Sequence, residues 1–254
     1  MNVSRRTTLR ALAGFAALPL SPLPAFSAEP PRRFRLIVLD VGGTIIQDRG
    51  DVVRTLMSSM QAHGVTVTAE EIGPWRGAAK HSVIEHFVAE NTKLAVKERQ
   101  TLSKKIYRDF VEQVSAAYKD VPPIAGTEDA LRKLAERGYL LATNTGFERE
   151  IVMPILSRLG WVKYFKAIVA SDDVSEGRPA PYMIFRAMEL SQVHSVAEVL
   201  VVGDTPLDLQ SAHNAGVGAA IGVLSGSGTE EQLRKEPHTA ILPSVASLVD
   251  WLKP

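Results

Sequence analysis

The sequence predicts an α/β protein in which a doubly wound parallel sheet carries a helical cap inserted after its first strand. Five short apolar runs, each bounded by Gly, Asp, Asn or Ser, predict strands that are covered on both faces. Helical patterns lie between the later runs, and this alternation is typical of a parallel sheet. Between Asp48 and Asp120 the chain has amphipathic helical patterns and no strand-like run, which predicts the cap.

The expected elements follow one another along the chain. The strands are predicted at residues 36–41, 139–143, 167–171, 199–203 and 218–224, and the cap helices at 52–63, 80–90 and 96–118. Pro122 and Pro123 end the helical segment. Thr127 is a candidate N-cap for the next helix, which Gly138 ends. The sequence therefore predicts a core of residues 34–47 and 122–254 and a helical cap of residues 48–121.

Composition narrows the classes of function. The chain has 254 residues and a net charge of +1, so nothing in its charge indicates binding of nucleic acid. Cysteine is absent, which excludes disulfides and thiol catalysis and leaves oxygen or histidine ligands for any metal. No segment after the first thirty residues is long and apolar enough to cross a membrane.

The first residues are typical of an export signal. Arg5 and Arg6 precede an apolar run from Ala11 to Leu20, and small residues follow up to Ala28. This order predicts a cleavable signal over residues 1–28. Its paired arginines resemble a twin-arginine signal, so we expect a periplasmic protein that is free of the membrane in its mature form. The alternative is a disordered basic tail.

Four loops that follow predicted strands carry polar groups suited to catalysis. In an open α/β sheet, the carboxyl ends of the strands lie at one edge, where ligands bind. Each loop alone is a weak signal, because an aspartate after a strand is more often a helix cap than a catalyst. Together and in this order they predict one site. The candidate residues are Asp40, Thr145 with Gly146, Arg178, and Asp204 with Asp208.

This set of loops resembles the haloacid dehalogenase superfamily over residues 34–254. The resemblance implies a Rossmann-like core, an aspartyl nucleophile and a magnesium ion. It implies that Asp40 is both the nucleophile and a magnesium ligand, with the Gly42 carbonyl and the Asp204 carboxylate as further ligands. Asp208 would hold a water ligand of the metal; the alternative is that Asp208 only caps the following helix. Oxygen ligands of this kind suit Mg²⁺.

The same resemblance places a phosphoryl group against the first three loops. Thr145 and the Gly146 amide would bind its oxygens, and Arg178 would supply the cation that is usually a lysine. Gly42 and Gly43 form the turn after Asp40 and are expected beside the bound group. The alternative for Arg178 is a surface cation, although the prolines on either side of it favour a fixed loop.

Two details resemble the phosphonatase branch of that superfamily, the phosphonoacetaldehyde hydrolases. Asp40 is followed by Val-Gly-Gly-Thr, close to the branch's Asp-x-Ala-Gly-Thr, so the second aspartate found in many relatives is absent. In the cap, Gly77 and Lys80 match a Gly-x-x-Lys motif whose lysine forms a Schiff base with the substrate. This chain departs from the branch at three positions. It has Arg76, Val83 and Phe147 where the branch has a methionine, a histidine and a tyrosine, respectively.

The absence of an acid at Gly42 and the presence of an amine at Lys80 have one chemical explanation. A phosphate monoester expels an alkoxide and benefits from a general acid. A 2-oxoalkylphosphonate expels carbon, which needs an iminium ion to accept the electron pair of the C–P bond. Lys80 must then be partly neutral, and we expect a lowered pKa from burial and from Arg76, one helical turn away if this segment is a helix. Arg76 is also a candidate contact for the substrate or its phosphoryl group. The alternative is a solvated surface lysine.

The sequence thus predicts an exported, magnesium-dependent hydrolase that cleaves the C–P bond of a small 2-oxoalkylphosphonate through a Lys80 imine and an Asp40 phosphoenzyme. One alternative is a phosphatase of the same superfamily that acts on a small phosphate monoester and uses Lys80 only as a substrate contact. Another is a non-catalytic binding protein with a vestigial site. Helical caps of this kind often support dimers in relatives, so a homodimer is a further expectation.

Overall fold

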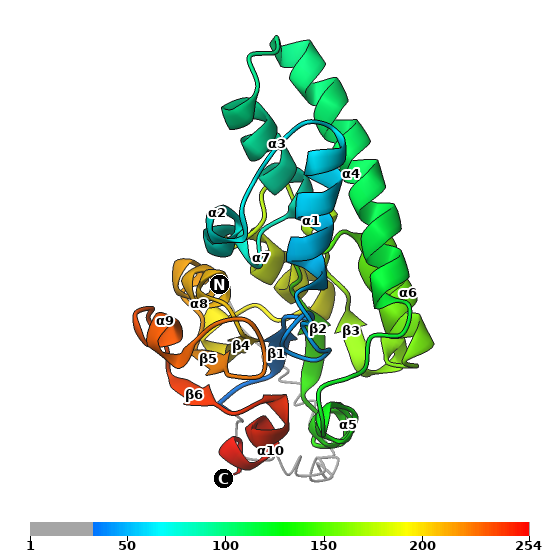
Figure 1. Ribbon diagram of the computed structural model, residues 1–254. Helices are drawn as coiled ribbons and strands as arrows, with labels where there is room; N and C mark the ends of the chain where they lie inside the picture. Colours follow the sequence, from blue (N-terminus) through cyan, green and yellow to red (C-terminus); the bar gives the residue numbers. More distant parts are fainter. Residues whose placement is uncertain (1–32, 254) are drawn as a thin grey trace, which may run out of the picture. The chain divides into compact units, whose positions relative to one another are not determined.

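The computed structural model describes residues 33–253, and the predicted export signal lies outside the described residues. Residues from Arg33 onward pack as one unit. Its centre is a six-stranded sheet with all neighbours parallel, in the order β3-β2-β1-β4-β5-β6 (Figure 1). This confirms the predicted α/β fold class. The strands are β1 (Leu36–Leu39), β2 (Leu140–Thr143), β3 (Phe165–Ala167), β4 (Val199–Gly203), β5 (Ala219–Val223) and β6 (Ala240–Leu242).

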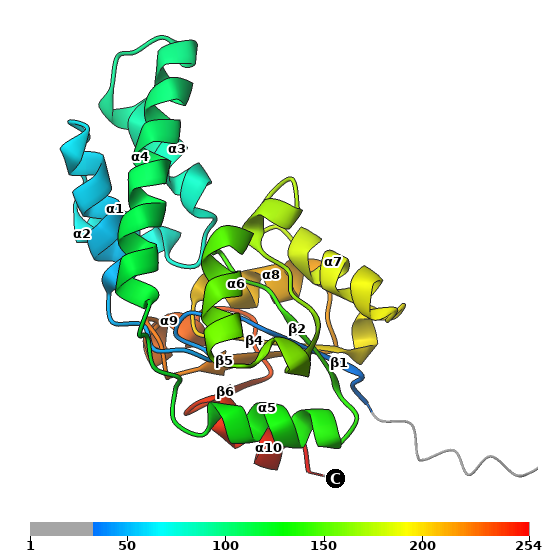
Figure 2. The same ribbon diagram turned by 90° about the vertical axis from the view of Figure 1, so that its right-hand side faces the viewer.

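Helices cover both faces of the sheet, as doubly wound topology requires (Figure 2). Successive side chains of β1 enter different clusters: Ile37 and Leu39 belong to one, Leu36 and Val38 to the other. Burial on both faces explains why the central strands read as unbroken apolar runs. The helices of this part are α5 (Thr127–Glu136), α6 (Arg149–Arg158), α7 (Tyr182–Ser191), α8 (Pro206–Ala215), α9 (Glu230–Arg234) and α10 (Leu248–Trp251).

Four α-helices lie between β1 and α5 and form the cap, on the side of the sheet drawn uppermost in Figure 1. The segments that enter and leave the cap run side by side, because Gln47 N–H donates to the Pro122 carbonyl at 3.1 Å and Ile124 N–H donates to the Ile45 carbonyl at 3.1 Å. The contacts divide residues 33–253 no further, so the domain boundaries at 48 and 121 stay a prediction. The cap helices are α1 (Asp51–Ala62), α2 (Ala69–Ile72), α3 (Lys80–Asn91) and α4 (Val96–Tyr118).

Short 3₁₀ turns connect several of these elements. They are η1 (Gly73–Trp75), η2 (Val162–Tyr164), η3 (Ser171–Asp173), η4 (Val196–Glu198) and η5 (Val245–Ser247).

Two strand predictions are corrected by the structure. The third strand ends at Ala167 rather than at residue 171, because the Thr143 hydroxyl accepts a 2.8 Å hydrogen bond from Val169 N–H where a backbone carbonyl of β2 would otherwise pair. The edge strand β6 was not expected; it has three half-buried residues, too few to show a pattern. Among the described residues, no helix is long and apolar enough to cross a membrane.

Candidate active site

The cap and the carboxyl ends of the strands enclose a cavity whose empty space, counted with its opening to solvent, is about 550 Å³. Gly43 and Asp208 do not line it, but Asp208 contacts Arg178, and a side chain on Gly43 would clash with the Asp204 carboxylate. The structure therefore brings the sequence-predicted site residues together. Those that line the cavity are Asp40, Gly42, Arg76, Lys80, Thr145, Gly146, Arg178 and Asp204.

Arg178 is the central cation of the site, and its side chain is only 1% exposed. Its Nη2 donates to Asp40 Oδ1 at 3.1 Å, and its Nη1 forms an ion pair with Asp208 Oδ1. The alternative of a surface cation is therefore excluded. The other oxygen of Asp208 accepts hydrogen bonds from Thr205 N–H at 3.0 Å and from Thr205 Oγ1 at 2.6 Å, so Asp208 also caps α8.

One carboxylate oxygen from each of Asp40, Asp204 and Asp208 lies within 4.8 Å of the other two, and all three residues are buried. Burial, and then repulsion from Asp40, raise the pKa of Asp204 to about 7. Asp204 is fixed by hydrogen bonds from Ser227 N–H at 2.8 Å and from Thr44 Oγ1 at 3.2 Å. Hard divalent cations prefer oxygen donors of this kind. These three aspartates thus form a site that could bind a metal ion.

Lys80 is the first residue of α3, and it is only 5% exposed. Its Nζ donates a hydrogen bond to the Ala78 carbonyl and lies 5.8 Å from the centre of the Phe147 ring. Burial is the largest cause that lowers its pKa from 10.5 to about 8, and Arg178 acts in the same direction. Glu148 and Asp40 oppose the shift. Lys80 is therefore a buried amine that lines the same cavity as Asp40 and Asp204, and the alternative of a solvated lysine is wrong.

The expected arrangement of Arg76 and Lys80 on one helix face is wrong. Arg76 follows the short 3₁₀ turn η1, Gly77 has a φ of 87°, and α3 begins only at Lys80. An α-helix requires negative φ throughout, so Gly77 breaks any continuous helix here. The cation that lowers the pKa of Lys80 is Arg178, which comes from the core rather than from the cap.

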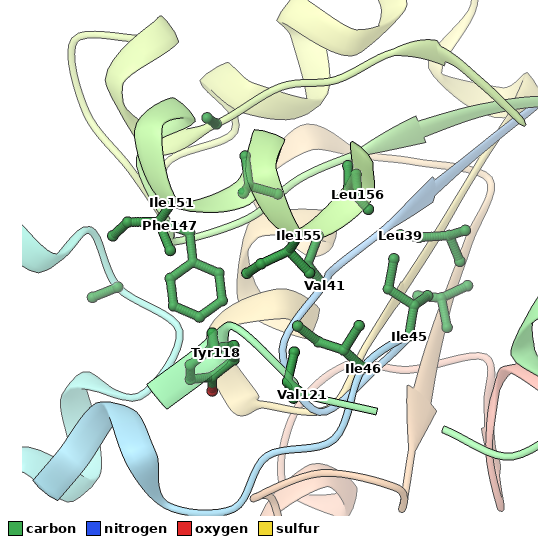
Figure 3. Packing of buried hydrophobic residues seen from close by; sticks show 14 of the residues in the cluster. Leu39, Val41, Ile45, Ile46, Tyr118, Val121, Phe147, Ile151, Ile155 and Leu156 are labelled. Carbon is green, nitrogen blue, oxygen red and sulfur yellow. The ribbon is translucent and has the colours of Figure 1, made fainter. Parts of the chain in front are cut away.

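Phe147 is a neighbour of Gly42 at the cavity. A Cβ built on Gly42 would lie 3.4 Å from Phe147 Cε2, which is an ordinary van der Waals contact. The ring packs edge-on against Tyr118, with centroids 5.4 Å apart at 73° (Figure 3). Figure 3 also places Val41 and Ile155 in the same hydrophobic cluster. The aromatic ring nearest to Gly42 is therefore held by the hydrophobic cluster between the core and the cap.

The cap loop that carries Lys80 rests directly on the core. A Cβ on Gly146 would clash with the Gly77 carbonyl and would lie 2.7 Å from the Ala78 carbonyl oxygen. A Cβ on Gly177 would come within 3.2 Å of the Ala79 side chain. A Cβ atom cannot lie closer than about 3 Å to backbone atoms, so only a glycine at position 146 allows the backbone of Gly77 and Ala78 to approach so closely. This backbone-to-backbone contact brings Lys80 to the cavity.

Sequence reasoning missed Glu148, although it lies only two residues after Gly146 of the predicted Thr145–Gly146 loop. Glu148 is 4% exposed, and its Oε1 accepts from His81 N–H at 3.3 Å and lies 3.2 Å from His81 Nδ1. The side-chain hydrogen bond is the largest cause that raises the pKa of His81. The second oxygen of Glu148, Oε2, is buried, and no hydrogen-bond partner for it lies within residues 33–253. Glu148 therefore joins the core to the start of α3, next to Lys80.

Comparison with known proteins agrees with this geometry. A family model described as haloacid dehalogenase-like hydrolase matches residues 37–221. A phosphonoacetaldehyde hydrolase of Bacillus cereus is 30% identical over 211 residues, which cover 77% of each chain. A candidate pyrophosphatase, PpaX, of Caldanaerobacter subterraneus is 28% identical over 182 residues, covering 71% of this chain and 78% of the relative.

A solved structure has the same fold. The phosphonoacetaldehyde hydrolase-like protein of Oleispira antarctica superposes with a TM-score of 0.73 at 20% identity, covering 87% of this chain and 92% of the other. The family model spans more than half of the chain, and the resemblance to phosphonatases seen in the sequence is confirmed. The chain belongs to the haloacid dehalogenase-like hydrolase family, with phosphonatase-like and phosphatase-like relatives.

Proposed function

We propose that this chain is a magnesium-dependent, phosphonatase-like hydrolase that cleaves the C–P bond of a small 2-oxoalkylphosphonate. The observation that carries the proposal is the buried amine of Lys80, which lines one cavity with Asp40 and has a pKa of about 8. At pH 7 roughly a tenth of such an amine is neutral, against less than a thousandth for an ordinary lysine. A reactive amine at this position serves imine chemistry.

The apolar surroundings of Gly42 support the same chemistry. A phosphatase benefits from a proton donor for its alkoxide leaving group, and Gly42 offers none and has the Phe147 ring as a neighbour. Expulsion of a carbon leaving group requires an electron acceptor instead of an acid. The imine of Lys80 supplies that acceptor.

The proposed reaction proceeds in four steps. The neutral Lys80 amine adds to the substrate carbonyl carbon, and loss of water gives an iminium ion. The Asp40 carboxylate then attacks phosphorus, the C–P bond breaks, and its electron pair moves to the nitrogen to form an enamine. A proton adds to the former phosphorus-bearing carbon, and water hydrolyses the resulting imine to the carbonyl product and Lys80. A second water hydrolyses the Asp40 phosphoryl ester to phosphate.

The residues of the core hold the phosphoryl end in this scheme. Arg178 is paired with Asp40 at 3.1 Å and can neutralise phosphoryl oxygens that approach the nucleophile. Thr145 and Gly146 line the same wall of the cavity. Asp40, Asp204 and Asp208 would hold Mg²⁺, whose charge offsets the repulsion between the nucleophile and an anionic substrate.

Borohydride trapping tests the imine. The protein is incubated with phosphonoacetaldehyde and sodium borohydride, and the modified residue is located by peptide mass spectrometry. We expect a reduced adduct on Lys80 and none in Lys80→Arg, which keeps the positive charge but has no amine that can condense. Turnover of the phosphonate with no adduct at Lys80 would refute the imine.

The second candidate function is hydrolysis of a small phosphate monoester, which the similarity to a candidate pyrophosphatase favours. Under this alternative Lys80 is only a substrate contact, so ester hydrolysis should survive in Lys80→Ala. A panel of phosphonates and phosphate esters, run on wild type and on Lys80→Ala, separates the two. Loss of phosphonate turnover in Lys80→Ala, together with negligible ester turnover by the wild type, supports C–P cleavage.

We further propose that residues 1–28 direct the protein to the periplasm through the twin-arginine route. The test is cell fractionation of the full chain and of a variant in which Arg5 and Arg6 are both replaced by lysine. The wild type should be found in the periplasmic fraction and the variant in the cytoplasm. Equal distribution of the two proteins would contradict the proposal.

A further inference from the structure

Arg76 is a cation of the cavity that has no partner in the described part of the chain. It follows η1, and its backbone N–H donates to the Gly73 carbonyl at 3.2 Å. Its side chain lines the same cavity as Lys80 and Asp40. Its Nε is buried and makes no hydrogen bond. A guanidinium nitrogen that is buried without an acceptor is destabilising, so a partner is expected from outside the chain.

The other two cations of the cavity are already engaged. Arg178 pairs with both Asp40 and Asp208, and Lys80 donates to the Ala78 carbonyl. The nearby carboxylate of Asp48 also has a role of its own, since it accepts a 2.8 Å hydrogen bond from Gly50 N–H. Among the described residues, Arg76 is thus the one cation of the cavity whose side chain has no partner within the chain.

Arg76 and Lys80 come from one loop of the cap, with only three residues between them. The phosphoryl end of a substrate would lie against Asp40 in the core, and its carbonyl carbon must reach Lys80. Whatever is attached to the carbonyl carbon then faces the cap. Most cap residues that line the cavity are apolar, Trp75 among them, and the charged ones are Asp48, Arg76 and Lys80. With Lys80 used for the imine, Arg76 is the cap cation that can meet this group.

We propose that Arg76 binds a carboxylate attached to the substrate's carbonyl carbon, so that the substrate class is the 3-phosphono-2-oxo acids, of which phosphonopyruvate is the simplest. This inference rests on the proposed C–P cleavage. A guanidinium matches a carboxylate through two parallel hydrogen bonds, which an apolar side chain at this position could not form. The reaction remains balanced: the C–P electron pair moves to the Lys80 imine, a solvent proton adds to carbon, and the products are a 2-oxo acid and phosphate.

The test compares kcat/KM for phosphonopyruvate and phosphonoacetaldehyde, which differ only by the carboxylate. The proteins are wild type, Arg76→Met, Arg76→Lys and, as a matched control, Arg108→Met. Arg108 is an exposed arginine of the cap that does not line the cavity. We expect wild type to prefer phosphonopyruvate by roughly 10- to 100-fold, the range for a charge-assisted hydrogen bond. Arg76→Met should abolish this preference, Arg76→Lys should restore part of it, and Arg108→Met should keep it.

Other outcomes overturn the inference in distinguishable ways. Equal loss on both substrates in Arg76→Met would mean that Arg76 binds the phosphoryl group. If the wild type prefers phosphonoacetaldehyde and an adduct is trapped at Lys80, the proposal of C–P cleavage stands and the proposal that Arg76 binds a substrate carboxylate is refuted. Absence of turnover and of trapping with both compounds would remove the proposed function and this inference together.

A second measurement needs neither phosphoryl group nor metal. Pyruvate can condense with Lys80, and borohydride reduction followed by intact-mass analysis gives the pyruvate concentration for half-maximal trapping. Acetone serves as the comparison ketone because it has no carboxylate. We expect pyruvate to trap wild type at a concentration at least tenfold lower than acetone does. Equal concentrations for the two ketones would refute a carboxylate site at Arg76, even if the Arg76 variants failed to fold.

Discussion

Replacing Lys80 by methionine should inactivate the enzyme and yet stabilise its fold. The pKa of Lys80 falls from 10.5 to about 8, and each pKa unit corresponds to about 1.36 kcal/mol, so the charged amine costs the fold about 3 kcal/mol below pH 8. Methionine is unbranched, apolar and of similar length, so it fills the same space without this cost. It also loses the hydrogen bond to the Ala78 carbonyl, which contributes about 1 kcal/mol.

The net gain in the free energy of unfolding is therefore about 2 kcal/mol at pH 7. In a protein of this size each kcal/mol raises Tm by roughly 2–4 °C, so Tm should rise by roughly 4–8 °C. The stability difference between the two proteins depends on pH. Between pH 8 and 10.5 the unfolded chain binds a proton at Lys80 that the folded chain has lost, so the wild type gains stability as pH rises through this window.

The assay is thermal unfolding of wild type and Lys80→Met at pH 7 and pH 10. The difference between them should be largest at pH 7 and should nearly vanish at pH 10. Lys104→Met, on an exposed lysine of α4, is the control and should change stability by less than about 0.5 kcal/mol at either pH. The reasoning would be refuted if Lys80→Met were less stable than wild type at pH 7, or if the difference did not depend on pH.

Three further predictions follow from the site. Glu148→Gln removes the anion that raises the pKa of Lys80 most, so the acid limb of the kcat/KM profile should move to lower pH; an unmoved limb with lower activity would indicate a purely structural role. Gly146→Ala forces the cap loop at Gly77 away from the core, and kcat/KM should fall on the order of 100-fold while the thermal stability of the fold is largely kept; near-normal turnover would show that the contact is dispensable. Removal of the metal by EDTA should stop phosphate release but preserve borohydride trapping at Lys80, and loss of both would mean that the imine itself needs the metal.

Much of the sheet could be predicted from the sequence, because strands buried on both faces carry continuous apolar runs. Four of the five expected strands lie within a residue or two of their predicted places. The third strand was displaced because the Thr143 side chain replaces a backbone carbonyl as a partner of Val169, a contact between residues 26 positions apart. The strand β6 has only three residues at the sheet edge, too few for a period of two to show.

The candidate site was predictable to a similar extent and for a related reason. Asp40, Thr145 and Asp204 all follow parallel strands, and parallel strands end at one edge of a sheet. The cap helix was correctly expected to begin at Lys80, but the condition that Arg76 belongs to the same helix is not met, because Gly77 has a positive φ. Glu148 was missed because its contact with His81 joins the core to the cap across 67 positions.

The sequence by itself therefore determined the sheet, the edge at which Asp40 lies and the absence of an acid at Gly42, because these depend on residue identity and local periodicity. Only the tertiary structure decided that Lys80 is buried and that the Phe147 ring lies next to Gly42. The physical reason is that desolvation, which lowers the pKa of Lys80, arises only when the cap loop packs on the core at Gly146. No local pattern in the chain encodes that contact.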